Sequence, residues 1–174
     1  DQYDQMVMCD TVQKSGSDAA VIRIHNTSKA IAVTVDSSAN YCKSYPMTGG
    51  KQIVCENWRN LITVGAKPIA ITNCLNFGNP EKDIIMGQFV ECIHGISQAC
   101  QYLDFPVVSG NVSFYNRTQN RAISPTPTIG GVGLIKNLEN MMTKNFKEIE
   151  SYILVIGKTL GHLYQSEFFR EVVG

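Results

Sequence analysis

Hydrophobic residues first gather in two short β-rich runs, at residues 19–24 and 30–35, with a polar turn around residues 26–28 between them. Short runs rich in Val, Ile and Ala on either side of a turn are typical of paired antiparallel strands. The pattern therefore predicts a β-hairpin near the beginning of the chain.

Two longer segments repeat apolar residues every three to four positions, which is the spacing of one helix face. The first covers residues 50–64 and stops at Gly65. The second runs to residue 103. Asn79 is placed to cap its first turn, and Pro80 suits the first helical position, where a backbone N–H would have no partner. Both segments are predicted to be helices.

Further apolar runs predict strands at residues 67–76, 106–114 and 129–135, the first of them buried. The polar stretch 136–150 predicts a linker or a solvated helix, and residues 151–156 predict one more strand. Up to residue 135 the order is β-β-α-β-α-β-β. This order favours an α+β fold, with a mixed sheet that carries its helices on one face.

The length of 174 residues suits one domain and a short extension. We expect residues 1–148 to form the domain and residues 149–174 to be the truncated start of a following one. The chain lacks an initiator Met and stops at Gly174 within a helix-like segment. We therefore expect it to be a fragment of a longer protein.

Composition excludes several classes of function. Fifteen basic residues balance fifteen acidic ones and are scattered, which argues against a nucleic-acid partner. No apolar run approaches the ~20 residues that span a bilayer, and the polar start does not resemble a signal peptide. The six cysteines form no C-x-x-C and no close pair, so reduced thiols in a cytoplasmic protein are the better interpretation.

Familiar nucleotide-binding motifs are absent. Gly157 begins a Gly-Lys-Thr triplet, but a P-loop needs a glycine five positions earlier, where Tyr152 stands. The glycines at residues 130–133 do not match the dinucleotide-binding pattern and lie in a strand-like run. Candidate chemistry therefore rests on polar clusters at strand ends.

The first cluster, residues 71–80, ends a strand in two amides and a glycine just before a predicted helix. The free N–H groups of a helix N-terminus favour an anion. An equally good interpretation is a turn in which Asn76 and Asn79 act only as caps.

The second cluster, residues 106–116, alternates so that Ser109, Asn111 and Ser113 would share one face of a strand. Gly110 between them would let a backbone or a nucleotide approach closely. Asn111 supplies a neutral oxygen suited to Mg²⁺, which prefers oxygen ligands. The alternative is a half-exposed edge strand without a ligand.

The remaining polar positions favour structural roles. Two prolines in residues 124–131 cannot donate to a ladder, which indicates an edge strand or the start of a strand. Asp18 and Asp36 lie at predicted strand ends, where carboxylates suit either a metal or a turn. No partner is evident in the sequence for the three histidines, His25, His94 and His162.

Three blocks together closely resemble one family. They are residues 71–81 (ITNCLNFGNPE), 106–118 (PVVSGNVSFYNRT) and 123–134 (ISPTPTIGGVGL). They resemble the second half of the synthetase subunit of phosphoribosylformylglycinamidine synthase. The resemblance implies a fold of the aminoimidazole ribonucleotide synthetase type, of which this chain would be the N-terminal domain of the second half. It also implies that the sheet is half of a two-domain barrel, so a lone half should form a homodimer.

The implied activity is an ATP-dependent ligase of purine biosynthesis, with ATP and Mg²⁺ as cofactors. The substrate would be formylglycinamide ribonucleotide, and a glutaminase subunit or domain would supply ammonia. The resemblance implies that the family's catalytic histidine and most of its metal-binding carboxylates belong to the first half of the synthetase, which this chain lacks. We therefore expect the fragment alone to be inactive.

The resemblance also assigns roles by position. Gly110 would contact ATP, Asn111 would bind Mg²⁺ and Ser113 would contact the ribonucleotide. Asn73 stands where the family usually has an ATP-contacting aspartate, and Arg117 replaces a frequent glutamate. An amide still forms hydrogen bonds but not the stronger charge-assisted ones.

Two alternatives remain open at this stage. A selenophosphate or thiamine-phosphate enzyme of the same superfamily should carry an aspartate-rich metal motif, where this chain has isolated aspartates. A non-catalytic scaffold, or a structural nucleotide-binding half of the same fold, would suit the neutral Asn73 and the basic Arg117.

Overall fold

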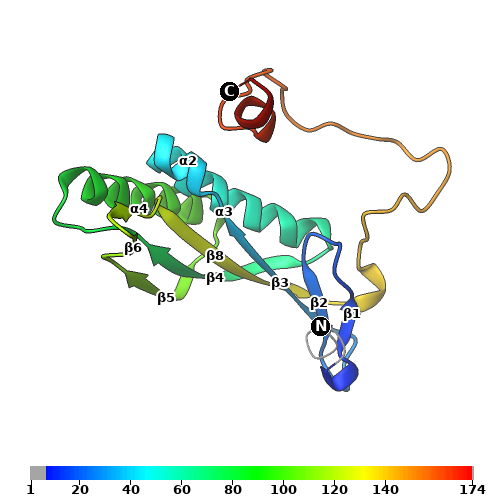
Figure 1. Ribbon diagram of the computed structural model, residues 1–174. Coiled ribbons are helices and arrows are strands. Elements are labelled where there is room, and N and C mark those ends of the chain that lie inside the picture. Colours follow the sequence, from blue (N-terminus) through cyan, green and yellow to red (C-terminus); the bar gives the residue numbers. More distant parts are fainter. Residues whose placement is uncertain (1–6, 174) are drawn as a thin grey trace. The chain divides into compact units, whose positions relative to one another are not determined.

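The computed structural model describes residues 7–173 and separates into two compact units. The first unit is Asp1–Lys144 and the second is Asn145–Gly174. Figure 1 shows the elements of the first unit in chain order. They are η1 (Val7–Cys9), β1 (Thr11–Gln13), β2 (Ala20–Arg23), β3 (Ala30–Ser37), α2 (Ala39–Ser44), α3 (Pro46–Thr63), β4 (Lys67–Asn76), α4 (Asp83–Leu103), β5 (Val107–Ser113), β6 (Arg117–Thr118), β7 (Arg121–Ala122), β8 (Thr126–Ile135) and η2 (Leu138–Asn140).

A six-stranded sheet in the order β1-β2-β3-β8-β4-β5 forms the base of this unit. β4 and β5 are parallel and joined through α4, whereas the other neighbours pair antiparallel. β2 and β3 form the predicted hairpin. The long helices α3 and α4 lie together over one face of the sheet (Figure 1). The predicted α+β fold, a mixed sheet with helices on one face, is therefore confirmed.

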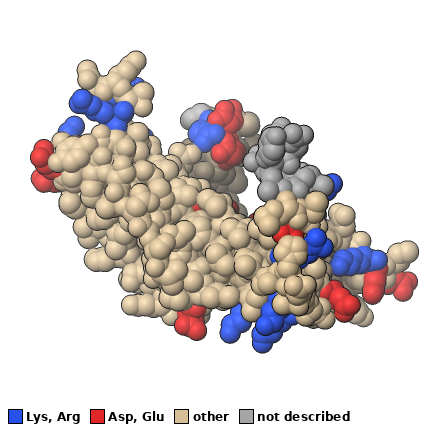
Figure 2. Space-filling model, turned by 90° about the horizontal axis from the view of Figure 1, so that it is seen from below, with Lys and Arg blue, Asp and Glu red and all other residues tan. Residues whose placement is uncertain are grey.

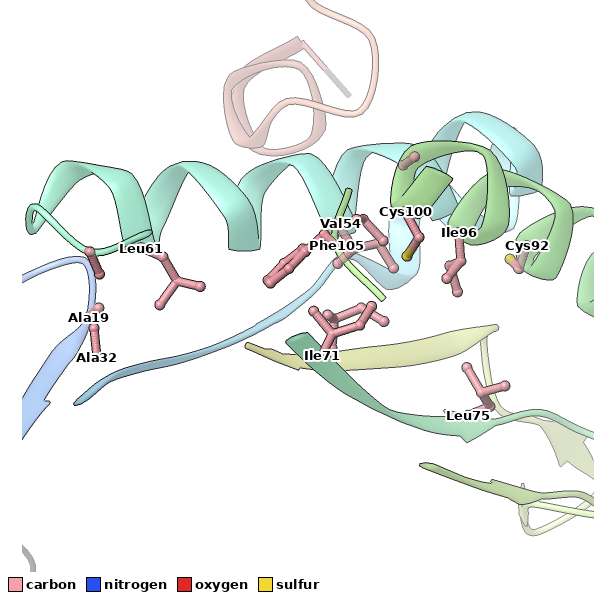
Figure 3. Packing of buried hydrophobic residues seen from close by; sticks show 14 of the residues in the cluster. Ala19, Ala32, Val54, Leu61, Ile71, Leu75, Cys92, Ile96, Cys100 and Phe105 are labelled. Atoms are coloured by element: carbon pink, nitrogen blue, oxygen red, sulfur yellow. The ribbon is translucent and has the colours of Figure 1, made fainter. Parts of the chain in front are cut away.

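The core fills the space between the helices and the sheet. Alternate residues of β3 and β8 are buried there, which is the two-residue period of strands with one covered face. Figure 3 shows Val54 and Leu61 of α3 and Ile96 of α4 pointing toward the sheet, in which Ile71 of β4 lies. Phe105, which has no exposed surface, lies in the same cluster.

Two glycines let α3 and α4 approach closely. A Cβ atom on Gly95 would lie 2.0 Å from the backbone oxygen of Met47, and one on Gly50 would lie 2.5 Å from that of Cys92. Real Cβ atoms do not come this close to backbone atoms. The two helices therefore cross with their backbones nearly in contact.

The helix starts differ from those predicted, although the helix ends agree. α3 begins at Pro46, four residues before the predicted start. α4 begins at Asp83, so the prediction that Asn79 and Pro80 open this helix is wrong. The side chain of Asn79 instead accepts a hydrogen bond from the Glu81 backbone N–H at 2.9 Å and closes a separate turn.

β4 has the predicted bounds, but it is buried only at Ile71 and Leu75, so the prediction of a buried strand is wrong. The other residues of β4 are half-buried or exposed. One face of the sheet is uncovered in this unit, so the strand is not enclosed on both sides. β8 begins at Thr126, and Pro127 pairs opposite Leu75 of β4. The proline-rich segment is therefore the start of an interior strand and not a sheet edge.

The second unit contains no strand among residues 145–173, so the prediction of a strand at residues 151–156 is wrong. Tyr152 and Ile156 are each 96% exposed, with no partner strand to pair with. A short π-helix, η3 (Phe169–Val173), lies near the end of the described part of this unit. The predicted domain boundary after residue 148 stays a prediction.

Two further findings concern the cysteines and membrane-spanning helices. All six cysteines are free thiols, as the sequence predicts. Among residues 7–173, no helix combines the length and the apolar character needed to cross a membrane.

Candidate nucleotide and metal site

The four residues singled out for ligand contacts lie on two neighbouring parallel strands, β4 and β5. Asn73 pairs opposite Gly110, and Asn76 pairs opposite Ser113. Asn111 lies between these pairs, opposite Cys74. The fold thus brings together residues that are 37 or more positions apart in the sequence.

Ser109, Asn111 and Ser113 share the uncovered face of the sheet, as the alternation predicts. The hydroxyl groups of Thr72 and Ser109 lie 2.7 Å apart, which fixes both side chains on one face. Ile71 is buried under the helices and its neighbour Thr72 is exposed, so this face is the one away from the helices.

Asn73 and Gly110 meet on the opposite, helix-side face. A Cβ atom on Gly110 would lie 2.0 Å from the Asn73 side-chain oxygen, so the amide occupies the space that a side chain would need. The sequence predicted a close approach to Gly110, and the neighbour in this chain is Asn73. Any larger residue at position 110 would displace that amide.

A shallow depression of about 480 Å³ follows the β5 edge of the sheet. Its residues come from β4, β5 and α4, and those of β5 belong to both faces because β5 is the last strand of the sheet. A ligand along this edge could touch Gly110 and Asn111 together. The lining residues are Asn73, Leu75, Phe89, Val107, Val108, Ser109, Gly110, Asn111 and Val112.

Asn116 positions Ser113, a role that the sequence reasoning missed. Its side-chain N–H₂ donates to the Ser113 carbonyl at 2.9 Å, to the Ser113 hydroxyl at 3.1 Å and to the Phe77 carbonyl at 3.1 Å. This asparagine ties the end of β5 to the segment after β4. The signal was present in the sequence, since an asparagine just after a strand often binds nearby backbone.

Asn111 is exposed, and none of the hydrogen bonds recorded among residues 7–173 involves its side chain. Its amide oxygen suits Mg²⁺, which binds oxygen ligands and usually takes one or two carboxylates and substrate phosphates. The described residues contain no group of three or more His, Cys, Asp or Glu side chains that could hold a metal. The Asn111 side chain can thus offer a single oxygen to a metal ion.

Asp36 belongs to a structural network between β3 and α3. Its carboxylate accepts hydrogen bonds from the side-chain amides of Asn57 and Asn60, each at 2.8 Å, and from the Thr34 hydroxyl at 3.2 Å. Asn57 is fully buried and also donates to the Ile129 carbonyl. Neither the metal role nor the turn role considered for Asp36 matches this arrangement.

Burial raises the pKa of Asp36, and the hydrogen bonds to it oppose that rise only in part. A carboxyl with a raised pKa binds its proton more tightly in the folded state. We therefore expect its contribution to the free energy of unfolding to fall as pH rises from about 4. Urea unfolding measures this change. Between about pH 4 and 7, the free energy of unfolding should fall less for Asp36→Asn than for the wild type.

The control for this experiment is Asp18→Asn, since Asp18 is exposed in a bend. It should leave the pH profile of the wild type unchanged. Identical profiles for Asp36→Asn and the wild type would contradict the assignment.

His25 has a partner that the sequence did not reveal. Its Nε2 lies 2.9 Å from the carboxylate of Asp10, which also accepts from Arg23 Nε at 3.1 Å. This cluster joins the segment before β1 to the end of β2. The side chains of Arg23 and His25 are exposed and that of Asp10 is partly buried, and none of the three belongs to the β4–β5 site.

Comparison with known proteins agrees with this fold. Residues 16–135 match the family model described as "AIR synthase related protein, N-terminal domain". The match covers more than half of the chain. The chain belongs to this family. Its motifs and its helix-covered mixed sheet are those of an AIR synthase-related N-terminal domain.

Close relatives of this AIR synthase-related domain are subunits of one enzyme. The chain is 64% identical over 172 residues to "Phosphoribosylformylglycinamidine synthase subunit PurL" of Pelagibacter ubique. It is 56% identical over 172 residues to the subunit of the same name of Azorhizobium caulinodans. These matches cover 99% of the chain but only 24% and 23% of the relatives. The chain thus spans about a quarter of their length.

Solved structures give the same relation. A structure described as PurLQS from Thermotoga maritima matches with a TM-score of 0.75 and 35% identity, over 83% of this chain and 24% of that one. T. maritima PurL complexed with ATP matches with a TM-score of 0.69 and 35% identity, over 75% of this chain and 22% of that one. A ThiL structure at 21% identity and a TM-score of 0.56 shares the fold alone.

Proposed function

We propose that this chain is part of a phosphoribosylformylglycinamidine synthase, an ATP-dependent ligase of purine biosynthesis. The observation that carries the proposal is the 64% identity to a PurL subunit along almost the whole chain. T. maritima PurL structures described with ATP and with FGAR support ATP as the cofactor and formylglycinamide ribonucleotide as the substrate. The chain spans about a quarter of such a subunit, so the activity is proposed for the longer protein.

In the proposed reaction, ATP phosphorylates the amide oxygen of formylglycinamide ribonucleotide. Ammonia then attacks the amide carbon and displaces phosphate, which gives the amidine, ADP and inorganic phosphate. A glutaminase subunit or domain would supply the ammonia. Catalysis of this kind depends mainly on positioning and on electrostatic stabilisation of the transferred phosphoryl group.

The roles proposed for single residues are those that the resemblance to the family assigns by position, and all of these residues lie on β4 and β5. Asn73 and Gly110 would contact ATP from the helix-side face at the sheet edge, where both line the depression. Asn111 would give one oxygen to Mg²⁺, and the ion would neutralise phosphate charge when bound. Ser113, held by Asn116, would donate its hydroxyl to the ribonucleotide.

The uncovered sheet face supports a partner across it. Val35, which is 67% exposed, Ile31 and Val132 make it apolar, and its centre is largely uncharged in Figure 2. Such a contiguous apolar face favours association. We propose that the first half of the synthetase covers it to close a two-domain barrel, and that a second copy would do so for the chain alone. Residues 1–148 would then form the domain that contributes to the barrel. We also propose that the enzyme is cytoplasmic.

The test is ammonia-dependent turnover of formylglycinamide ribonucleotide by the full-length protein that contains this chain. Asn111→Ala should lower kcat more than tenfold and raise the Mg²⁺ concentration needed for half-maximal rate, because one metal ligand is lost. Asn111→Asp, which keeps an oxygen ligand, should retain more activity than Asn111→Ala.

Asn40→Ala is the matched control, since Asn40 is exposed on α2, far in sequence from the site. It should leave both quantities unchanged. Absence of turnover in the wild type would contradict the ligase function. Normal turnover in a folded Asn111→Ala protein would keep the function and remove the metal role.

A non-catalytic nucleotide-binding half is the second candidate. The observation in its favour is that the site residues Asn73, Gly110, Asn111 and Ser113 are all uncharged. Such a half should bind ATP, yet tolerate Asn111→Ala without loss of turnover by the longer protein.

A further inference from the structure

A second cavity is lined by the loop that joins β4 to α4, by the segment after β5 and by the β6–β7 hairpin. Its volume is about 350 Å³. None of the proposed ATP, metal or substrate residues lines it. The lining residues are Asn79, Lys82, Tyr115, Asn116, Arg117, Asn120 and Ala122.

Backbone hydrogen bonds hold the two walls of the cavity together. The Tyr115 N–H donates to the Gly78 carbonyl at 2.9 Å, and the Asn116 N–H donates to the Phe77 carbonyl at 3.1 Å. Asn116 reinforces the contact through its side chain, which also donates to Phe77. These bonds join the segment that follows β5 to the loop that follows β4, so the two walls of the cavity are held to each other.

The lining carries two positive charges and no negative one. No ion pair between side chains of residues 7–173 engages either Lys82 or Arg117. Both acidic neighbours of Lys82 in sequence, Glu81 and Asp83, lie outside the lining of the cavity. Only Glu81 is hydrogen-bonded to residues that line it. Its carboxylate accepts hydrogen bonds from the Asn79 amide and the Tyr115 hydroxyl, each at 3.4 Å.

We propose that this cavity is a binding site for a phosphate group. Arg117 offers a planar fork of donors that matches phosphate oxygens, and Lys82 adds a compact charge from the opposite wall. Asn120 adds an amide that can donate to the same group. The volume lies at the small end of ligand sites, which suits inorganic phosphate or a small phosphate ester such as a sugar phosphate.

The hairpin register provides an internal control for the charge. Arg117 pairs opposite Ala122, and Thr118 pairs opposite Arg121. Directly opposed residues lie on the same face of a strand pair, and successive residues lie on opposite faces. Arg117 and Ala122 both line the cavity, so Arg121 lies on the other face of the same hairpin.

Isothermal titration calorimetry at low ionic strength tests the site directly. The probes are inorganic phosphate and ribose 5-phosphate, added to the 174-residue chain or to the full-length protein. Arg117→Glu and Lys82→Gln should each weaken phosphate binding about tenfold or more, because a charged hydrogen-bonding partner is lost. Arg117→Lys should keep more affinity than Arg117→Glu, and binding should weaken with added salt.

Arg121→Glu makes the same change of charge outside the cavity, and it should alter the affinity by less than about threefold. Far-UV circular dichroism verifies that each variant is folded. Equal losses for Arg117→Glu and Arg121→Glu, or no binding of either probe by the wild type at millimolar concentrations, would overturn the proposal. Tighter binding of ribose 5-phosphate than of inorganic phosphate would identify the occupant as a phosphate ester, and equal binding would identify the phosphate group alone.

The site does not depend on the proposed ligase. Its readout is binding of a phosphate group, which Asn111→Ala should leave unchanged because Asn111 does not line the cavity. The Asn111 variants therefore test turnover, whereas the Lys82 and Arg117 variants test phosphate binding. Failure of one proposal can be told apart from failure of the other.

Discussion

Replacement of Phe105 with alanine is expected to lower the free energy of unfolding by about 3–5 kcal/mol, the range for a buried aromatic in a core. Phe105 has no exposed surface and follows Asp104, whose left-handed backbone ends α4. The backbone N–H of Phe105 still bonds the Cys100 carbonyl at 2.9 Å, so the residue is fixed on both its main chain and its side chain. Truncation would leave a void that this fixed turn cannot fill by moving.

Urea unfolding followed by circular dichroism measures this change. Tyr102→Ala is the matched control, because Tyr102 is also an aromatic residue near the end of α4 but is 90% exposed. Its effect should stay within about 0.5 kcal/mol. Similar losses for the two variants would mean that the ring of Phe105 is not part of the packed core.

The second large effect is expected at the crossing of α3 and α4. Gly95→Ala should lower the free energy of unfolding by about 3 kcal/mol, because the new methyl group would meet the Met47 backbone oxygen at 2.0 Å. The obstacle is backbone and not a flexible side chain, so the helices themselves must move apart. This strain outweighs the roughly 1 kcal/mol by which alanine favours a helix over glycine.

Gly87→Ala, in the same helix, should change the free energy of unfolding in the opposite direction. A Cβ atom on Gly87 would have nothing within 4 Å, so only helix propensity changes, and the free energy of unfolding should rise by about 0.5–1 kcal/mol. Denaturant titration of both variants measures the two changes in the free energy of unfolding. A stabilising Gly95→Ala would contradict the close crossing of the two helices.

The sequence predicted those parts of the fold that depend on local pattern. Helix periodicity located α3 and α4, and β-rich runs located β4, β5 and the β2–β3 hairpin. It failed where one local signal fits two structures. Asn79 and Pro80 suit a helix start, but Asn79 closes its own turn through Glu81 instead. The apolar run at 151–156 resembles a strand, yet it has no neighbouring strand and remains exposed.

The candidate site likewise combines features that local pattern predicts with features that it does not. Alternation alone predicted that Ser109, Asn111 and Ser113 share a face, because the period of a strand is a local property. The contact of Asn73 with Gly110 depends on the pairing of β4 with β5, which no local pattern encodes. The phosphate cavity likewise needs the hairpin and the β4–α4 loop to meet in space. The sequence placed Asn79 and Asn116 in two separate polar clusters, and nothing in it indicated that these clusters meet.

The position of β8 has a consequence for how the chain folds. β8 is the last strand in sequence, yet it lies between β3 and β4 in the sheet and pairs with both. On a ribosome that adds roughly 5–20 residues per second, β4 would wait several seconds before its partner β8 emerges. During that time β3 and β4 present unpaired edges, which are prone to pair with other chains. Folding of this sheet is thus non-local and slow by topology, and a nascent chain that ends before β8 lacks the strand that joins its two halves.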